Sequence, residues 1–508
     1  MRLVNAPPSP SQTLKGLVEK QPLLQQVVHL FQTMTEKTPN ASLWLVGGAV
    51  RDALHTGKLG TDWDMVPCGI TNINDFCEQL SRTLATRLQG TLVPLHEAFG
   101  MHRVVLKDGS ERIIYVDVAA CQGGTITDDL SRRDLSVNAM AMRLDGDTAE
   151  FVDPYQGAND LHIGLIRAIS KQNLIDDPLR LLRVYRLAAC LQASSIDEVT
   201  QGWIKQHAAL LWNAAPERIT TEWLRLLSAP PCWPWLVAMG QSGLLEVLLP
   251  ELTPTHAIPP NSHHHLPLWD HTLELVNQAE TTVFPSLSTA LQNELQVPFH
   301  EGYTGNGITR QGLIHWACLL HDIGKPATHE ILDDGRHAFH GHDRVGEDLT
   351  KAMAKRFKLG NDWTQTLTQL VRWHLYPCAF TPQSPRKSLL RFYRRLGHRT
   401  EDLLVLALAD RLSTRGPALS DEQVTQDLSD LHGLLQDYRE FRPALEQPPL
   451  IGGKDVMVLL GIPPGPALGN LLKIVRDKQL LGELSTQEEA EQWLLLQNGN
   501  WQERGADK

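Results

Sequence analysis

The sequence predicts an α+β fold for about its first 165 residues and a nearly all-helical fold after them. Short apolar runs at Leu43–Val46, Arg103–Leu106 and Ile113–Val118 each have the length of one buried strand. Apolar residues recur with a helical period at about 14–34 and 72–88. Beyond these segments the helical period continues and strand patterns become rare. We therefore expect one mixed domain followed by helical units.

The size and charge of the chain limit what it can be. A length of 508 residues is enough for about three or four domains. An apolar content of 42% allows sizeable hydrophobic cores. The net charge of −11 argues against a protein that coats nucleic acid without selectivity, so any RNA contact must use a local group of basic residues.

The sequence also predicts a cytoplasmic protein with no membrane partner. No window approaches the roughly twenty apolar residues of a membrane span. The N-terminal segment MRLVNAPPSPSQTLK lacks the apolar core of a signal peptide. The 7 cysteines include no Cys-x-x-Cys pair, which indicates reduced thiols rather than a disulfide framework or a zinc ribbon.

Proline pairs and polar stretches suggest where the domains end. Pro259-Pro260 precedes a His-rich stretch, and Pro448-Pro449 precedes the last helical segment. The polar, Gly-containing segment at about 283–310 predicts a long loop or insertion. The expected domains are a head at 1–165, a helical neck at 166–257, a second helical domain at 258–415 and a helical tail at 416–508.

Two glycines and two aspartates form the most informative pattern in the chain. Gly47-Gly48 follows the first predicted strand, and a glycine pair lets backbone N–H groups come close to a phosphate. Asp62 and Asp64 follow at positions i and i+2, which share one face of a strand. Adjacent carboxylates suit Mg²⁺, which proteins usually hold with one or two carboxylates and substrate phosphates. Each half of the pattern is common in simple turns, but together they predict a nucleotidyl-transfer site.

Three further motifs follow in order. Asp117 lies in the strand predicted at 113–118, either as a third carboxylate of the site or as the partner of a nearby arginine. Arg132-Arg133-Asp134 is followed by the segment SVNAMA. Asp176-Asp177-Pro178-Leu179-Arg180 then opens a predicted helix, where the spacing i, i+3 would place Asp177 and Arg180 on one face. Arg183 and Arg186 continue that face.

In this order the motifs resemble the DNA polymerase β-type nucleotidyltransferase superfamily. Within it, they are similar to class II tRNA nucleotidyltransferases and bacterial poly(A) polymerases. The resemblance covers about residues 40–250 and includes PERITTEWL at 216–224, which looks like the helical neck of that family. It implies a polymerase β-like nucleotidyltransferase head followed by an all-helical neck.

The resemblance also implies a role for each motif. Asp62 and Asp64 would hold Mg²⁺, and Asp117 would accept the proton of the attacking hydroxyl or complete the metal shell. Asp177 and Arg180 would imitate a base-pairing edge and select CTP or ATP. The other nucleotide-binding residues implied are Gly47, Gly48, Arg51, Asp52, Arg133, Asp134 and Arg183.

A second set of ligand-type residues lies in the predicted domain at 258–415. The segments LPLWDHTLELV, LLHDIGKP and LALADRLS carry histidines and aspartates that resemble the HD phosphohydrolase superfamily, and two later histidines match its additional positions. Such nitrogen and oxygen ligands suit Mn²⁺, Ni²⁺, Fe²⁺ or Mg²⁺. A metal here would activate water against a phosphate ester. The six residues of the expected site are His271, His321, Asp322, His342, His374 and Asp410.

The last unit resembles the C-terminal part of many class II enzymes. Ser485 and Glu488 lie three residues apart before a helical pattern, which predicts a capping box. A basic cluster precedes this unit and has the local charge that RNA phosphates require, although a solvated helix face is the alternative. The cluster consists of Arg386, Lys387, Arg391, Arg394, Arg395 and Arg399, with Phe392 and Tyr393 between them.

These features predict an enzyme that adds C, A or both to the 3′ end of tRNA from CTP and ATP with Mg²⁺. Two alternatives remain open. One is a poly(A) polymerase of the same fold. The other is an HD phosphohydrolase that acts on RNA ends and whose head domain only binds the RNA. The residues do not decide between CC, A and CCA addition, nor do they indicate an oligomeric state.

Overall fold

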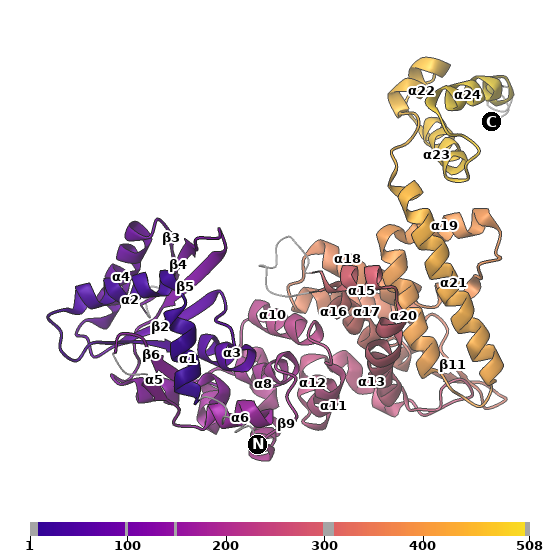
Figure 1. Ribbon diagram of the computed structural model, residues 1–508. Coiled ribbons are helices and arrows are strands. Elements are labelled where there is room, and N and C mark those ends of the chain that lie inside the picture. The colour runs from indigo at the N-terminus through magenta and orange to yellow at the C-terminus, as the bar shows by residue number, and fades with distance from the viewer. Residues whose placement is uncertain (1–8, 97–99, 147–149, 298–308, 503–508) are drawn as a thin grey trace, which may run out of the picture. The chain divides into compact units, whose positions relative to one another are not determined.

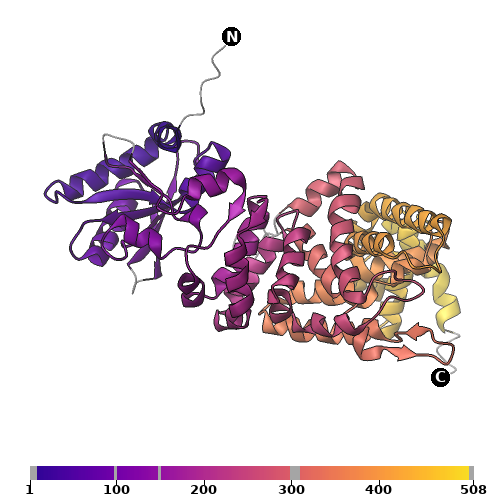
Figure 2. The ribbon, with the colours of Figure 1, turned by 90° about the horizontal axis from the view of Figure 1, so that it is seen from below.

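The computed structural model describes residues 9–96, 100–146, 150–297 and 309–502. These residues form two compact units, Met1–Pro250 and Glu251–Lys508. In Figures 1 and 2 the described strands lie in the indigo-to-magenta part of the chain, apart from the short pair β10 (Glu330–Ile331) and β11 (His337–Ala338). The mixed head and the helical remainder predicted from the sequence are confirmed.

The first unit is built on a seven-stranded sheet with the order β3-β4-β5-β2-β1-β6-β7. Most neighbouring strands are antiparallel, but β2 and β5 are parallel. All three apolar runs predicted as strands are strands. The strands are β1 (Ser42–Val46), β2 (Asp62–Cys68), β3 (Thr91–His96), β4 (Met101–Lys107), β5 (Ile113–Val118), β6 (Ala141–Arg143) and β7 (Phe151–Val152).

The two faces of this sheet are buried differently. Leu43 and Leu45 on β1 point to one face and join a large core with four helices, whereas Trp44 and Val46 point to the other face and join a smaller core. The helices of the large core are α1 (Pro10–Glu19), α2 (Pro22–Thr35), α3 (Gly48–Thr56) and α4 (Ile73–Arg87). The smaller core includes residues of α5 (Ile126–Ser131). The helical pattern at 14–34 is divided between α1 and α2, because Pro22 begins a new helix.

The remainder of the first unit is largely helical. A short parallel pair, β8 (Leu165–Ile166) and β9 (Ser195–Ile196), lies among the helices. The longest of them, α8 and α10, pack against each other. The helices are α6 (Gly157–Ile163), α7 (Lys171–Asp176), α8 (Leu179–Cys190), α9 (Glu198–His207), α10 (Pro216–Leu227), α11 (Trp233–Gln241) and α12 (Leu244–Leu248).

The second unit is helical around α20 (Thr400–Ser413), whose residues from Thr400 to Ala409 are all buried. α20 packs against α13, α16 and α21. The last three helices have a small core of their own. The other helices are α13 (Leu268–Gln278), α14 (Phe284–Ser286), α15 (Thr289–Gln296), α16 (Arg310–Leu320), α17 (His342–Arg356), α18 (Asn361–Trp373), α19 (Arg386–Leu396), α21 (Asp421–Glu446), α22 (Gly453–Leu460), α23 (Pro466–Leu480) and α24 (Gln487–Gln502).

Two local predictions need correction. The segment 283–310 is not simply a long loop, because α14 and α15 lie within it; residues 298–308 lie outside the described residues. The capping box lies one residue later than predicted: the backbone N–H of Glu489 donates to Thr486, and the carboxylate of Glu489 accepts from the N–H of Ser485. The four expected domain boundaries stay predictions.

Two predictions about the whole chain can be compared with the structure. All 7 cysteines are free thiols, as their scattered positions indicated. Among the described residues, no helix has both the length and the apolar character needed to span a membrane.

Candidate active site

The three aspartates predicted as catalytic share one face of the head sheet. On β2, Trp63 and Met65 belong to the large core, so Asp62 and Asp64 point to the opposite face. On β5, Val116 and Val118 belong to the same core, so Asp117 also points away from it. The parallel register of β2 and β5 pairs Asp64 with Asp117. The sheet therefore places all three carboxylates on one face of two neighbouring strands.

Arg103 on β4 holds the third carboxylate. Its Nε donates to Oδ1 of Asp117 and its Nη2 donates to Oδ2, both at 2.7 Å. Among the described residues, the three head carboxylates do not form a group of ligand atoms within 4.8 Å of one another. Asp117 thus occupies the position of a third carboxylate and is at the same time the partner of an arginine.

Burial and the charges of neighbouring carboxylates raise the pKa of Asp62 and of Asp64. Burial raises the pKa of Asp64 to about 6, and the charges of Asp117 and Asp62 add to this effect while Arg133 opposes it. Burial also raises the pKa of Asp62, against the charge of Arg103. A bound cation would relieve this repulsion, and oxygen ligands suit Mg²⁺, so the residues fit a magnesium site.

The glycine pair lies directly beside Asp64. Gly47 has a φ of +65°, and a Cβ atom there would lie 2.6 Å from Nη1 of Arg133 and 3.4 Å from Oδ2 of Asp64. Gly48 is the first residue of α3, so the N-terminus of this helix opens beside the carboxylate. The positive φ of Gly47 is a conformation that favours glycine over residues with a side chain. The glycine pair and Asp64, which the sequence pattern linked, are therefore neighbours in the fold.

Arginine and aspartate side chains next to the glycine turn are fixed by hydrogen bonds. Arg51 donates to Oδ1 of Asn138 at 2.5 Å and to Oδ1 of Asp52 at 2.7 Å. Arg133 forms an ion pair with Asp129 at 3.0 Å. These contacts hold two of the predicted phosphate-binding arginines near Asp64, whose pKa both of them lower.

Asp134 is buried and connects the arginine motif to α8. Its carboxylate accepts hydrogen bonds from the backbone N–H of Leu135, from Nδ2 of Asn138 and from Nε of Arg183, each at 2.9 Å. Burial alone would raise the pKa of Asp134, but the charge of Arg183 and these hydrogen bonds outweigh it and lower the pKa to about 2. Asp134 and Arg183 therefore act as a charged pair in the folded protein.

Asp177 and Arg180 do not share a helical face, so that part of the prediction is wrong. α7 ends at Asp176, Asp177 is extended, and α8 begins at Leu179. The cause is Pro178, because a residue before proline avoids the helical conformation. Asp177 instead forms an ion pair with Arg218 at 2.9 Å. Nη1 of Arg180 donates to the carbonyl of Asn173 at 3.0 Å.

Several residues that position the site were not singled out from the sequence. Asn173 donates to the carbonyls of Ser131 and Arg133, which ties α7 to the arginine motif. Glu222 was not singled out either: its buried carboxylate pairs at 2.8 Å with Arg186, which the sequence had placed on the nucleotide-binding face and which instead supports the packing of α8. The only sequence signal for Arg218 was its place in the neck motif.

The second predicted site is also assembled. His271 lies on α13, His321 and Asp322 follow the end of α16, and Asp410 lies on α20. His342 begins α17 and His374 follows α18. Two groups of potential ligands lie within 4.8 Å in this unit: His271, His321 and Asp410 in one, and Asp322, His342 and His374 in the other.

Asp322 connects the two groups through its two oxygens. Its Oδ2 lies 3.1 Å from Nε2 of His321 and 3.8 Å from Nε2 of His271. Its Oδ1 lies 3.4 Å from Nε2 of His342 and 3.5 Å from Nε2 of His374. All six residues predicted from the sequence are therefore brought together in one cluster.

Backbone carbonyls orient three of the imidazoles. Nδ1 of His321, His342 and His374 lies 2.7–2.9 Å from a carbonyl oxygen, which can only accept, so Nδ1 carries the proton. Nε2 then has its lone pair free for a metal. Burial lowers the pKa of His271 and of His374, which favours the neutral form that binds metals. The donor set thus fits a metal centre.

Family models match the regions that carry both sets of residues. Residues 43–167 match the poly A polymerase head domain, residues 195–255 match a probable RNA and SrmB-binding site of polymerase A, and residues 291–415 match the HD domain. The A-adding tRNA nucleotidyltransferase of Deinococcus radiodurans is 33% identical over 453 residues, which are 88% of this chain and 93% of that protein. The chain belongs to the tRNA nucleotidyltransferase family.

Further relatives agree with this assignment. The CC-adding tRNA nucleotidyltransferase of Thermus thermophilus is 32% identical over 461 residues, 89% of this chain and 93% of that protein. The structure of the Thermotoga maritima CCA-adding enzyme complexed with tRNA has the same fold, with a TM-score of 0.61, 21% identity and coverage of 96% of this chain and 98% of that one. In this tRNA nucleotidyltransferase, His271 precedes the residues that match the HD domain, and the geometry nevertheless places it in the cluster.

Proposed function

We propose that this tRNA nucleotidyltransferase adds C, A or both to the 3′ end of tRNA, with CTP and ATP as nucleotide donors. The observation that carries the proposal is the placement of Asp64 beside the Gly47-Gly48 turn, with Asp62 on the same face of β2. Relatives named for A addition and for CC addition support the choice of tRNA as acceptor. CCA-adding enzymes of the same fold are solved with ATP and with CTP.

Each group at the head has a proposed task. The N–H groups at the start of α3, together with Arg51 and Arg133, bind the triphosphate, because helix N-termini and guanidinium groups favour phosphate oxygens. Asp62 and Asp64 would hold Mg²⁺, which neutralises phosphate charge and lowers the pKa of the terminal RNA hydroxyl when it is bound. Asp117 lies next to Asp64 and accepts the proton of that hydroxyl.

Base selection is assigned to Asp177, which precedes α8, and to Arg180 in the first turn of α8. Arg180 offers guanidinium donors, and Asp177 offers carboxylate acceptors, which together can complement the edge of a base. Asp134, buried and paired with Arg183, fixes the start of α8 relative to the arginine motif. Selection therefore depends on protein groups rather than on a template strand.

A panel of three tRNAs tests the proposal. One tRNA lacks the whole CCA end, one lacks only the final A, and one is complete; each is incubated with CTP alone, ATP alone or both. The enzyme should extend the first tRNA, the second or both by no more than the missing residues, and it should leave the complete tRNA unchanged. Long A tracts on any of them would instead identify a poly(A) polymerase.

The six-residue cluster supports a second activity. We propose that the HD unit hydrolyses a phosphate ester at an RNA end. A transition metal or Mg²⁺ held by these histidines and aspartates would supply an activated water when it is bound. Lys325 lies 2.5 Å from Asp322, where its ammonium group can hold a substrate phosphate near the cluster. This activity is separable from nucleotide addition, because the two residue sets belong to different compact units.

A further inference from the structure

Two cysteines lie on the same face of the head sheet as the three aspartates. Cys68 ends β2, four residues after Asp64, and Cys121 follows β5, four residues after Asp117. An even spacing along a strand keeps side chains on one face, and both cysteines belong to the smaller core on that face. Four residues of strand span about 13 Å. The two thiols are therefore separate from the carboxylates of the proposed magnesium site.

The register of the two parallel strands brings these thiols together. It pairs Met65 with Val118, and the backbone N–H of Ala119 continues the ladder by donating to the carbonyl of Met65 at 3.0 Å. Three residues further along each strand are Cys68 and Cys121, whose side chains are hydrogen-bonded to each other. Neighbouring strands lie about 4.8 Å apart, within the range of about 4.4–6.8 Å between the Cα atoms of a disulfide. The pair can therefore be crosslinked without moving either strand far.

The two thiols differ in reactivity. Cys121 is 9% exposed and Cys68 is 4% exposed, so Cys121 is the one nearer to solvent. The thiol of Cys68 donates to the sulfur of Cys121, and the backbone N–H of Gly124 donates to it as well; both contacts lower the pKa of Cys121, against its burial. The same hydrogen bond raises the pKa of Cys68. Because the thiolate is the nucleophile, Cys121 is suited to react first and Cys68 to resolve the product.

The turn after Cys121 is linked to an arginine at the nucleotide-transfer site. The backbone N–H of Gln122 donates to Oδ1 of Asp129 at 3.2 Å, and Nη2 of Arg133 donates to Oδ2 of the same carboxylate at 3.0 Å. Arg133 lies against the glycine turn, since a Cβ atom at Gly47 would be 2.6 Å from its Nη1. A covalent bond that draws Cys121 toward β2 would therefore disturb the carboxylate that holds Arg133 in place.

We propose that Cys68 and Cys121 form a redox switch, in which hydrogen peroxide converts the two thiols to a disulfide and the crosslink slows nucleotide addition. The thiolate of Cys121 attacks one peroxide oxygen, and the other leaves as hydroxide, which takes up the proton of the Cys121 thiol and becomes water. The sulfur of Cys68 then attacks the sulfenic acid, and the disulfide forms as a second water leaves. Two thiols thus lose two electrons and two protons to one peroxide. The effect on nucleotide addition rests on the proposed function, whereas the crosslink does not.

The crosslink is tested by mass spectrometry on the full-length protein. The protein is treated with peroxide, its remaining thiols are alkylated, and it is digested with trypsin. The peptides 59–82 and 113–132 should appear joined by a disulfide and should separate after dithiothreitol. Fragment ions should place the bond at Cys68 rather than at Cys77, which lies in the same peptide but belongs to the larger core. A bond through Cys77, or no bond between these peptides, would overturn the proposal.

The switch is tested by the rate of addition to a tRNA lacking its CCA end, measured before oxidation, after oxidation and after dithiothreitol. Oxidation should slow the wild type by roughly tenfold or more, because a displacement of about 1 Å in a positioning group can cost up to about 10²-fold. Cys121→Ser should keep its rate in all three states. Cys378→Ser is the matched control, since Cys378 is an exposed thiol of the other compact unit, and it should respond as the wild type does.

Cys121→Ala replaces the serine variant if thermal unfolding shows that the buried hydroxyl is not tolerated. A crosslink that leaves the rate unchanged, or equal slowing of the wild type and the Cys121 variant, would contradict the switch. Because the crosslink is measured without nucleotide addition, a protein that forms it reversibly but extends none of the three tRNAs would refute the proposed function and leave the disulfide standing. A protein that extends tRNA and forms no crosslink would refute this inference alone.

Discussion

Asp117 on β5 is paired in register with Asp64 on β2, and Arg103 holds its carboxylate through two hydrogen bonds of 2.7 Å. The sequence left two interpretations of Asp117 open, a third catalytic carboxylate or the partner of an arginine. In the structure Asp117 fulfils both interpretations, because it lies beside Asp64 and also pairs with Arg103. The arginine orients the carboxylate beside Asp64, and a proton acceptor in this position needs such a fixed orientation.

Removing the Asp117 side chain should therefore lower the rate of nucleotide addition more than removing the side chain of Arg103. Asp117→Ala should lower the rate of nucleotide addition by about 10²-fold or more, the usual contribution of a positioned base. Arg103→Ala should cost much less, because the carboxylate remains in place. The measurement is the addition rate at saturating CTP and tRNA, with thermal unfolding of both variants as the folding control. Equal losses in the two variants would mean that only the ion pair matters.

Arg180 should govern the choice of base more than the binding of triphosphate. Arg180→Ala should reduce discrimination between CTP and the other nucleotides by roughly tenfold, since a guanidinium that completes a base-reading edge is removed. The ratio of kcat/KM values for the four nucleotides measures this. Lys171→Ala, an exposed change at the start of α7, is the control. A variant that binds all nucleotides more weakly with unchanged selectivity would make Arg180 a phosphate contact.

Asp322→Ala should abolish hydrolysis while nucleotide addition continues. Asp322 is the residue that contacts histidines of both ligand groups, so its loss should lower the metal content of the purified protein as well as the activity. Metal analysis, hydrolysis of a 2′,3′-cyclic phosphate and nucleotide addition are measured on one preparation. Asp348→Ala, an exposed change on α17, is the control. Full hydrolysis by the Asp322 variant would place the activity elsewhere.

Asp134 should make the free energy of unfolding of the first unit decrease at low pH. Its pKa is about 2 in the folded protein against an ordinary value of 3.8, so the folded state binds fewer protons in this range. The resulting stabilisation, about 2 kcal/mol, is complete above pH 4 and is lost as the pH falls toward 2. Asp134→Asn should therefore lower the free energy of unfolding at pH 6, and its difference from the wild type should shrink below pH 4. Urea unfolding at several pH values measures this, and a difference independent of pH would contradict the assignment.

Strands and ligand types could be predicted from the sequence because they depend on local patterns. The run Ile113–Val118 corresponds to β5 residue for residue, since its apolar side chains fill one face of a sheet. The six HD-type ligands were also identifiable, because each lies in a short motif. Their division between the two oxygens of Asp322 was not, because it depends on how five helices pack.

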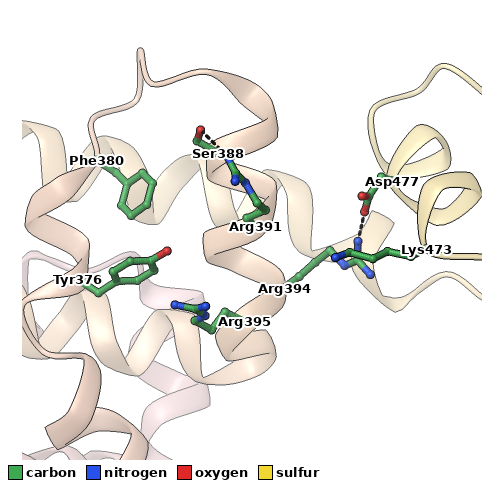
Figure 3. A pocket seen from close by; sticks show the side chains of 8 residues that line it. All are labelled: Tyr376, Phe380, Ser388, Arg391, Arg394, Arg395, Lys473 and Asp477. Carbon is green, nitrogen blue, oxygen red and sulfur yellow. Dashed lines mark hydrogen bonds and ion pairs between the residues drawn. The ribbon is translucent and has the colours of Figure 1, made fainter. Parts of the chain in front are cut away.

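Errors arose where one residue changes the backbone or a distant residue supplies the partner. Pro178 removes Asp177 from the helix on which its spacing to Arg180 was based. Its ion-pair partner, Arg218, is distant in sequence and is supplied by α10. In the basic cluster, composition could not separate Arg386, which pairs with Asp437, from Arg391, which lines a cavity together with Lys473 (Figure 3).

The most direct test of the account is labelled CTP and ATP incorporation into a tRNA lacking its CCA end, compared between the wild type, Asp62→Ala and Asp64→Ala. Asp75→Ala, an exposed change on α4, is the control. The wild type and the control should incorporate nucleotide. Both carboxylate variants should fold and yet lose incorporation, because the charge stabilisation they support contributes several kcal/mol to the barrier. Near-normal incorporation by either carboxylate variant in Mg²⁺ would contradict the account.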